Sequence, residues 1–149
     1  MTLTQKEQTL IKDMKDQEQL CIEKYMKYAN DACDGGLKNL FSQIGQVEQQ
    51  HLQTLNQIES GTVPTGNGGG TQPQVPAQPS NCSAEDKNKD KYLCQDALAT
   101  EKHASTLYNI SIFEFSDTAI RNLLNHIQKE EQEHGEKIYA YMSMNGMYA

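Results

Sequence analysis

The sequence predicts an all-α fold, a four-helix bundle assembled from two copies of one helical hairpin. Three observations predict this architecture. Apolar residues recur at spacings of three and four over four long segments. The two segments of the first half align with the two of the second half at a constant offset of 83 residues. A Gly- and Pro-rich stretch with neither charge nor periodicity separates the two halves.

The repeat is visible as identities at this offset. Twelve positions between 6 and 58 match their partners without a gap, where chance would give roughly three. The pairs are Lys6/Lys89, Leu10/Leu93, Asp13/Asp96, Glu18/Glu101, Tyr25/Tyr108, Asp34/Asp117, Asn39/Asn122, Leu40/Leu123, Ile44/Ile127, Glu48/Glu131, Gln49/Gln132 and His51/His134. The repeat predicts that the first helix superposes on the third and the second on the fourth, about a pseudo-two-fold axis.

The first hairpin is expected over residues 4–59. Thr4 and Glu7 form a capping-box pattern that begins a helix, and Asp34-Gly35-Gly36 ends it after about Cys33. The second helix is expected from about Leu37 to Glu59.

The second hairpin is expected over residues 83–143, with Ser83 capping the third helix and Ser116-Asp117 separating it from the fourth. The uncharged end from Tyr139 onward, with a Tyr- and Met-rich tail at 144–149, is expected to be frayed or to bind a partner.

The segment 60–82 predicts a flexible linker, part coil and part polyproline-like. About 22 residues span roughly 70 Å when extended, whereas a helix of about 28 residues is roughly 42 Å long. The linker can therefore run the length of the bundle and bring the second hairpin in from the opposite end. This long crossover makes the whole chain, residues 1–149, a single domain.

Two Glu-x-x-His pairs, Glu48/His51 and Glu131/His134, lie on the apolar stripes of the second and fourth helices. Residues three apart on a helix share a face, so each pair presents a carboxylate and an imidazole to one point. Glu18 and Glu101 occupy matching stripe positions on the first and third helices. We predict that these six residues hold two metal ions, with Glu18 and Glu101 completing or bridging the pair.

The charge balance of these positions also favours metal. A buried carboxylate costs several kcal/mol unless it is paired, and the stripes contain almost no Lys or Arg. Two divalent cations would balance the four carboxylates. Oxygen-rich ligation with imidazole and without thiolate suits iron best, and also manganese or zinc.

For the residues around these six positions, we predict support of the ligands, a place in the core or exposure to solvent. Tyr25 and Tyr108 lie seven residues beyond Glu18 and Glu101, and they either support the ligands or are plain core tyrosines. We expect Glu130, Glu133 and Glu136 on a solvated face, and His126 in solvent.

Composition excludes several classes of function. A net charge of −7 disfavours nucleic acid as a partner. No signal segment and no apolar run of about 18 residues occurs, which argues against a transmembrane segment. The four cysteines form no C-x-x-C pair, which excludes a rubredoxin-like or zinc-ribbon site and fits free thiols in the cytoplasm. Protein partners or self-assembly, for example as a dimer, remain as the expected interactions.

Taken together, Glu18, Glu48-x-x-His51, Glu101 and Glu131-x-x-His134 resemble the ligand motif of the ferritin-like di-iron carboxylate superfamily. The resemblance covers the chain apart from the linker and tail. Within that superfamily, the small size and the Met/Tyr-rich end are similar to the spore coat protein F family of spore-forming bacteria. The resemblance implies a ferritin-like bundle with two bound metal ions, and for a coat protein a place in the assembling spore during sporulation.

Two classes of function follow from the resemblance. The first is a metal-binding spore coat protein of the coat F type. The second is a di-iron or di-manganese oxidoreductase acting on O2 or peroxide, rubrerythrin-like or manganese-catalase-like. The chain departs from rubrerythrins because it lacks a cysteine-rich iron domain and has Ala104 where they carry a further Glu, which disfavours rubrerythrin-type peroxide reduction. Fold alone does not choose between a structural and a catalytic role.

Overall fold

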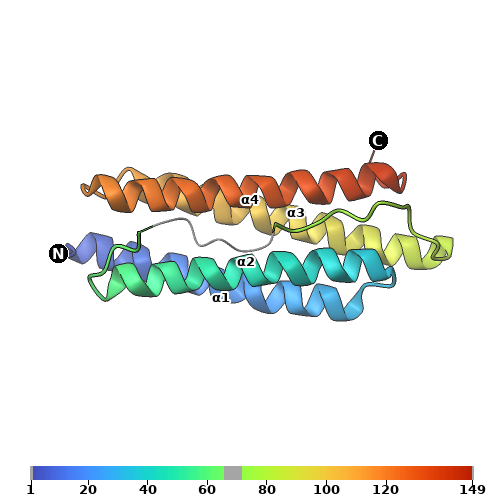
Figure 1. Cartoon of the computed structure of the whole chain (residues 1–149), viewed down its shortest axis with the longest axis horizontal. Helices are drawn as coiled ribbons and strands as arrows, with labels where there is room; N and C mark the ends of the chain where they lie inside the picture. Colours follow the sequence, from blue (N-terminus) through green and yellow to red (C-terminus); the bar gives the residue numbers. More distant parts are fainter. Residues whose placement is uncertain (1, 66–71, 149) are drawn as a thin grey trace.

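The computed structural model describes residues 2–65 and 72–148, which contain four long helices and no strand (Figure 1). Helix α1 spans Gln5–Asp31, α2 Gly35–Glu59, α3 Ala84–Ile112 and α4 Thr118–Met144. The predicted all-α chain of four helices is confirmed. None of these helices is long and apolar enough to cross a membrane.

The helices begin where capping residues stand. Thr4 and Glu7 form a complete capping box at α1, with Thr4 Oγ1 accepting from the backbone N–H of Glu7 and the Glu7 carboxylate accepting from that of Thr4. Ser83 accepts from the backbone N–H of Asp86 at the start of α3. Asp117 accepts from that of Ile120 at the start of α4. All three of these helix starts agree with the sequence predictions.

The two hairpins lie side by side, and their chain directions follow from the connection between them. In Figure 1, α2 ends at the left of the bundle and α3 begins at the right. Val63 packs against the apolar cluster that contains Ile11 and Leu124, whereas Val75 packs against the cluster that contains Leu37 and Tyr141. The last residues of α2 and the first of α3 therefore lie at opposite ends of the molecule, and α1 contacts α3 while α2 contacts α4.

The interior has two apolar clusters. The cluster near the α1–α2 loop includes Tyr25, Tyr28, Leu37, Phe41, Ile138 and Tyr141. The cluster near the α3–α4 loop includes Ile11, Met14, Leu55, Ile58, Phe115, Ile120 and Leu124. The buried charged residues that sequence analysis selected, such as Glu18 and Glu131, belong to neither cluster. On each helix they occupy positions between the residues of the two clusters.

The second part of the linker and the tail make specific contacts. The backbone N–H of Gln74 donates to Gln43 Oε1 at 2.6 Å, and that of Ser80 donates to Asn145 Oδ1 at 2.7 Å. Part of the predicted linker, residues 66–71, lies outside the described residues. The expectation of a frayed end is wrong up to residue 148, because α4 continues to Met144 and Met147 is buried in the cluster near the α1–α2 loop.

Candidate metal centre

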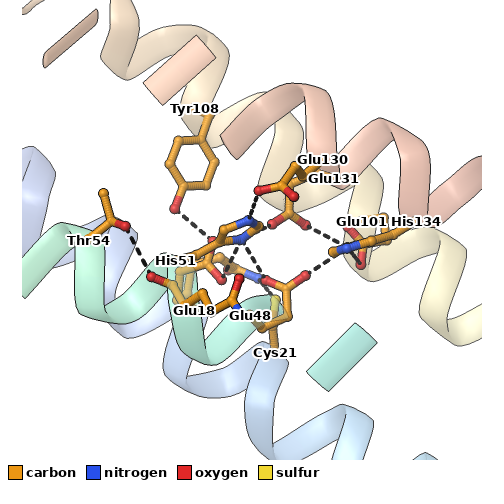
Figure 2. A network of polar contacts seen from close by, with 12 residues as sticks. Glu18, Cys21, Glu48, His51, Thr54, Glu101, Tyr108, Glu130, Glu131 and His134 are labelled. Carbon is orange, nitrogen blue, oxygen red and sulfur yellow. Dashed lines mark hydrogen bonds and ion pairs between the residues drawn. The ribbon is translucent and has the colours of Figure 1, made fainter. Parts of the chain in front are cut away.

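The six residues selected from the sequence meet between the four helices (Figure 2). All six side chains are buried, none more than 3% exposed. Helices α1 and α3 contribute one carboxylate each, whereas α2 and α4 each contribute a Glu-x-x-His pair. The side chains are Glu18, Glu48, His51, Glu101, Glu131 and His134. The helical spacing of three residues turns each Glu and its His to the same side of the helix.

These residues form two overlapping groups, each with the geometry to hold a metal ion. The first contains Glu18 and His51, the second contains Glu101 and His134, and Glu48 and Glu131 belong to both. Within each group one ligand atom per residue lies within 4.8 Å of the others. Sequence analysis expected Glu18 and Glu101 to complete or bridge the pair. The carboxylates common to both groups are those of the Glu-x-x-His helices α2 and α4, whereas Glu18 and Glu101 each belong to one group.

The shared carboxylates also contact the histidine of the opposite hairpin. His51 Nδ1 lies 2.9 Å from Glu131 Oε1, and His134 Nδ1 lies 3.0 Å from Glu48 Oε1. Each imidazole therefore turns Nδ1 toward the carboxylates, so Nδ1 is the nitrogen that a metal ion would meet.

Two buried tyrosines tie the hairpins together beside the cluster. Tyr25 donates to Glu101 Oε1 at 2.5 Å, and Tyr108 donates to Glu18 Oε1 at 2.7 Å. Each tyrosine therefore fixes the carboxylate of the other hairpin and leaves its second oxygen, Glu101 Oε2 or Glu18 Oε2, without a partner. Of the two alternatives for Tyr25 and Tyr108, these contacts favour support of the candidate ligands over a plain core role.

Without bound cations, the negative charges of the four buried carboxylates are not balanced. Burial, followed by the charges of Glu18 and Glu101, raises the pKa of Glu48 well above its usual range. Burial and the same neighbouring carboxylates, Glu101 foremost, raise the pKa of Glu131 in the same way. Neither Glu48 nor Glu131 has a hydrogen-bond partner for either carboxylate oxygen. Four carboxylates in a dry layer therefore lack the positive charge that would keep them all ionised.

The donor set fits two divalent ions. The unpartnered atoms of Glu18, Glu48, Glu101 and Glu131 are carboxylate oxygens, and those of His51 and His134 include Nδ1. Oxygen donors with one imidazole per ion suit iron and manganese, and zinc accepts the same ligands. The nearest thiol, Cys21, accepts from Gln17 Nε2 at 3.4 Å, and burial raises its pKa, so it stays protonated beside the cluster.

Glu130 is a functional candidate that sequence analysis missed. Its Oε1 lies 3.1 Å from His51 Nε2 and 3.1 Å from His126 Nε2, and its side chain is only 17% exposed. The expectation of a solvated Glu130 is therefore wrong, and His126 is an ion-pair partner with a side chain 32% exposed. Glu133, with a side chain also 32% exposed, pairs with Lys129 at the surface.

Glu130 contacts His51 and has no counterpart at His134, so these two histidines have different surroundings. The residue 83 positions before Glu130 is Val47, so the first hairpin offers no carboxylate at that place. His134 Nε2 correspondingly lacks a hydrogen-bond partner although the side chain is buried. The only sequence signal for Glu130 was its spacing of four residues from His126 on one helix.

Comparison with known proteins finds one family. Residues 89–149, which form most of α3 and all of α4, match the model of the Coat F domain. The matched segment includes Glu101, Glu131 and His134, whereas Glu18, Glu48 and His51 precede it. Neither the curated proteins nor the solved structures gave a match to the chain.

Proposed function

We propose that this chain is a ferritin-like protein of the spore coat type that binds two metal ions between its helices. The Coat F match over residues 89–149 supports the coat assignment. The overlapping groups around Glu48 and Glu131 support the metal assignment. The ferritin-like topology is the long crossover between two antiparallel hairpins, and the opposite ends reached by Val63 and Val75 support it.

One observation carries the metal proposal: the unpartnered oxygens of four buried carboxylates face one another. A buried carboxylate without a partner destabilises a fold by several kcal/mol, so a stable bundle needs cations or protons there. Two divalent cations balance four carboxylates and accept the two imidazoles as neutral ligands. Iron is the preferred candidate, and manganese or zinc also fits.

Glu18 and His51 would hold one ion, Glu101 and His134 the other, and Glu48 and Glu131 would bridge them. Bound iron or manganese would supply redox chemistry toward O2 or peroxide where a coordination position stays open. The chain itself orients the carboxylates through Tyr25 and Tyr108. The apolar clusters on either side exclude water along the bundle axis.

A place in a coat requires contacts with other protein chains. The exposed large apolar side chains include Phe113, Tyr92 and Met26, which are 85%, 67% and 63% exposed. Such residues fit self-assembly or binding of another coat protein, in keeping with the expected protein partners. In this role the metal ions hold the bundle together, and synthesis in the cytoplasm precedes deposition in the spore coat.

A second candidate function is a dimetal oxidoreductase acting on O2 or peroxide. The observation that favours it is a cavity between α3 and α4 whose lining includes Glu101 and Glu131. A purely structural centre needs no access from the surface, whereas a reactive one does. Peroxide consumption by iron- or manganese-loaded protein separates the two functions, because only the oxidoreductase consumes peroxide in proportion to its metal content.

The metal assignment is tested by substituting a bridging ligand and an exposed neighbour. Protein produced in iron-supplemented medium should contain two ions per chain by elemental mass spectrometry. Glu131→Ala should lose one or both ions because this carboxylate belongs to both groups. Glu133→Ala should retain both, since Glu133 lies at the surface beside Lys129. Two retained ions in Glu131→Ala, or loss in Glu133→Ala, would contradict the assignment.

A further inference from the structure

A cavity of about 510 Å³ opens between α3 and α4. Its lining is mostly apolar and includes Leu98, Gly135 and Tyr139. Lys102, Gln132 and Glu136 also line it and are exposed, so they mark its mouth. The opposite charges of Lys102 and Glu136 leave the mouth without a net preference for anions or cations. A volume of several hundred Å³ is in the range of cavities that bind small organic molecules.

Two of the residues that line the cavity are small. Ser105 on α3 and Gly135 on α4 line it, and the residues 83 positions earlier are Ile22 and Leu52. A Cβ added at Gly135 would meet only Leu98 Cδ2, at 3.9 Å, which is ordinary contact. The second hairpin is thus open at a place where the first hairpin carries branched side chains.

The inner end of the cavity reaches the predicted ligands. Glu101 and Glu131 both line it, and both are at least 97% buried. Glu101 Oε2 and both oxygens of Glu131 have no hydrogen-bond partner. A molecule in the cavity would therefore lie against the group formed by Glu101 and His134, away from the Glu130 contact that engages His51.

We propose that this cavity binds a small uncharged organic molecule with an apolar body beside the second metal position. The mostly apolar walls favour an uncharged ligand, because a charge placed against them would lose part of its hydration, and the charged groups of Lys102 and Glu136 lie only at the mouth. A diatomic gas would fill only a small part of the volume. The presence of a metal ion beside the cavity rests on the proposed function, whereas the cavity and its lining residues do not depend on it.

The test uses toluene as the probe and the full chain loaded with Zn²⁺. Toluene should bind saturably in NMR titrations, and the ammonium form of benzylamine, which is of similar size, should bind at least about tenfold more weakly. Gly135→Leu places in the cavity the residue that the first hairpin carries, and it should weaken toluene binding at least about tenfold. The variant should stay folded, because leucine favours a helix over glycine. Gly35→Leu makes the same exchange where nothing lies within 4 Å of an added Cβ, and it should bind toluene normally.

Loading with Co²⁺ locates the probe. Toluene in the cavity should show paramagnetic relaxation of its protons, and Gly135→Leu should remove that relaxation. Equal toluene binding by Gly135→Leu and the unsubstituted chain would overturn the proposal, as would binding without relaxation from bound Co²⁺. If the chain binds no Zn²⁺ or Co²⁺ at all, the proposed function fails instead. The toluene titration of the metal-free chain and of Gly135→Leu then still decides whether the cavity binds the probe.

Discussion

At the scale of single residues, Glu130 determines which nitrogen of His51 is free to bind metal. An ionised carboxylate only accepts hydrogen bonds. Burial would raise the pKa of Glu130, but the hydrogen bond with His51 and the charges of the neighbouring histidines together lower it. His51 Nε2 must then carry a proton in this contact, so Nδ1, which faces Glu131 and Glu48, is the nitrogen that loses its proton when a metal ion binds. Carboxylates that hold a metal-binding imidazole in this way raise its basicity and fix its orientation.

Glu130→Ala should therefore weaken metal binding although Glu130 is not a ligand. Loss of such a supporting carboxylate lowers metal affinity about 10- to 100-fold. Glu130→Gln keeps an acceptor oxygen but no charge. Its metal affinity should lie between that of the unsubstituted protein and that of Glu130→Ala. Competition with a chelator of known affinity measures the change, and Glu133→Ala serves as the exposed control. An affinity in Glu130→Ala equal to that of the control would show that the contact with His51 does not support the site.

The candidate ligands could be found from the sequence because two independent patterns coincide on them. Glu48 and His51 lie on an apolar stripe, and the 83-residue offset repeats them as Glu131 and His134. Glu130 follows neither pattern, because the preceding position on a helix points about 100° away from the stripe. Its contact depends on how closely α4 approaches His51 of α2. An apolar stripe also does not say which helices face each other across the bundle, so it could not show that Glu48 and Glu131 belong to both candidate groups.

At the scale of elements, the α1–α2 loop is held from outside its own hairpin. Asp34 is the N-cap of α2 but makes no capping bond with its side chain. The fully buried Asp90 of α3 instead accepts from the backbone N–H groups of Cys33 at 2.8 Å and Asp34 at 3.0 Å. Tyr141 of α4 donates to Asp34 Oδ2 at 2.8 Å. The second hairpin thus satisfies polar groups at the end of the first.

Asp90→Ala should destabilise the fold by about 1–3 kcal/mol, because it leaves two backbone N–H groups without their acceptor. The free energy of unfolding from urea denaturation measures the loss. Glu23→Ala removes an exposed carboxylate from α1 and should change stability by less than about 0.5 kcal/mol. A similar stability for both variants would mean that Asp90 does not hold the loop.

Sequence patterns located three of the four helix starts because capping is local. Thr4, Ser83 and Asp117 each act within three residues of their own position. The contacts of Asp90 and Met147 join segments far apart in the chain, and no local pattern contains them. The end of α4 was placed within one residue, but the packing of Met147 was missed, since a run of Tyr and Met looks the same whether it packs on a core or extends into solvent.

At the scale of the whole molecule, the buried charges make the stability of the metal-free protein depend on pH. The pKa values of Glu48 and Glu131 are raised, mainly by burial. The pKa of His51 is also raised, because the surrounding carboxylates outweigh a burial effect that would lower it. Groups with raised pKa values stabilise the fold at low pH, and this contribution is lost as pH rises through the folded-state pKa.

Glu18 and Glu101 respond in the opposite direction. Burial would raise their pKa values, but hydrogen bonds and the neighbouring histidines lower them. Their contribution is present above the unfolded-state pKa of about 4.5 and is lost only as pH falls through the lower folded-state value. Between pH 6 and 8, the change of stability with pH therefore comes from Glu48, Glu131 and the histidines.

The increase in melting temperature caused by metal should therefore be larger at about pH 8 than at about pH 6. In the metal-free chain, raising the pH removes protons from a dry cluster and lets its carboxylates repel one another, so its melting temperature should fall. In the loaded chain, the same deprotonation frees the ligands for the ions, so metal affinity rises with pH. Scanning calorimetry of chelator-treated and Mn²⁺-loaded protein at both pH values measures the two trends. Glu131→Ala should lose most of the metal-dependent increase at pH 8, and a metal effect that stays equal or shrinks from pH 6 to 8 would contradict cation binding by this cluster.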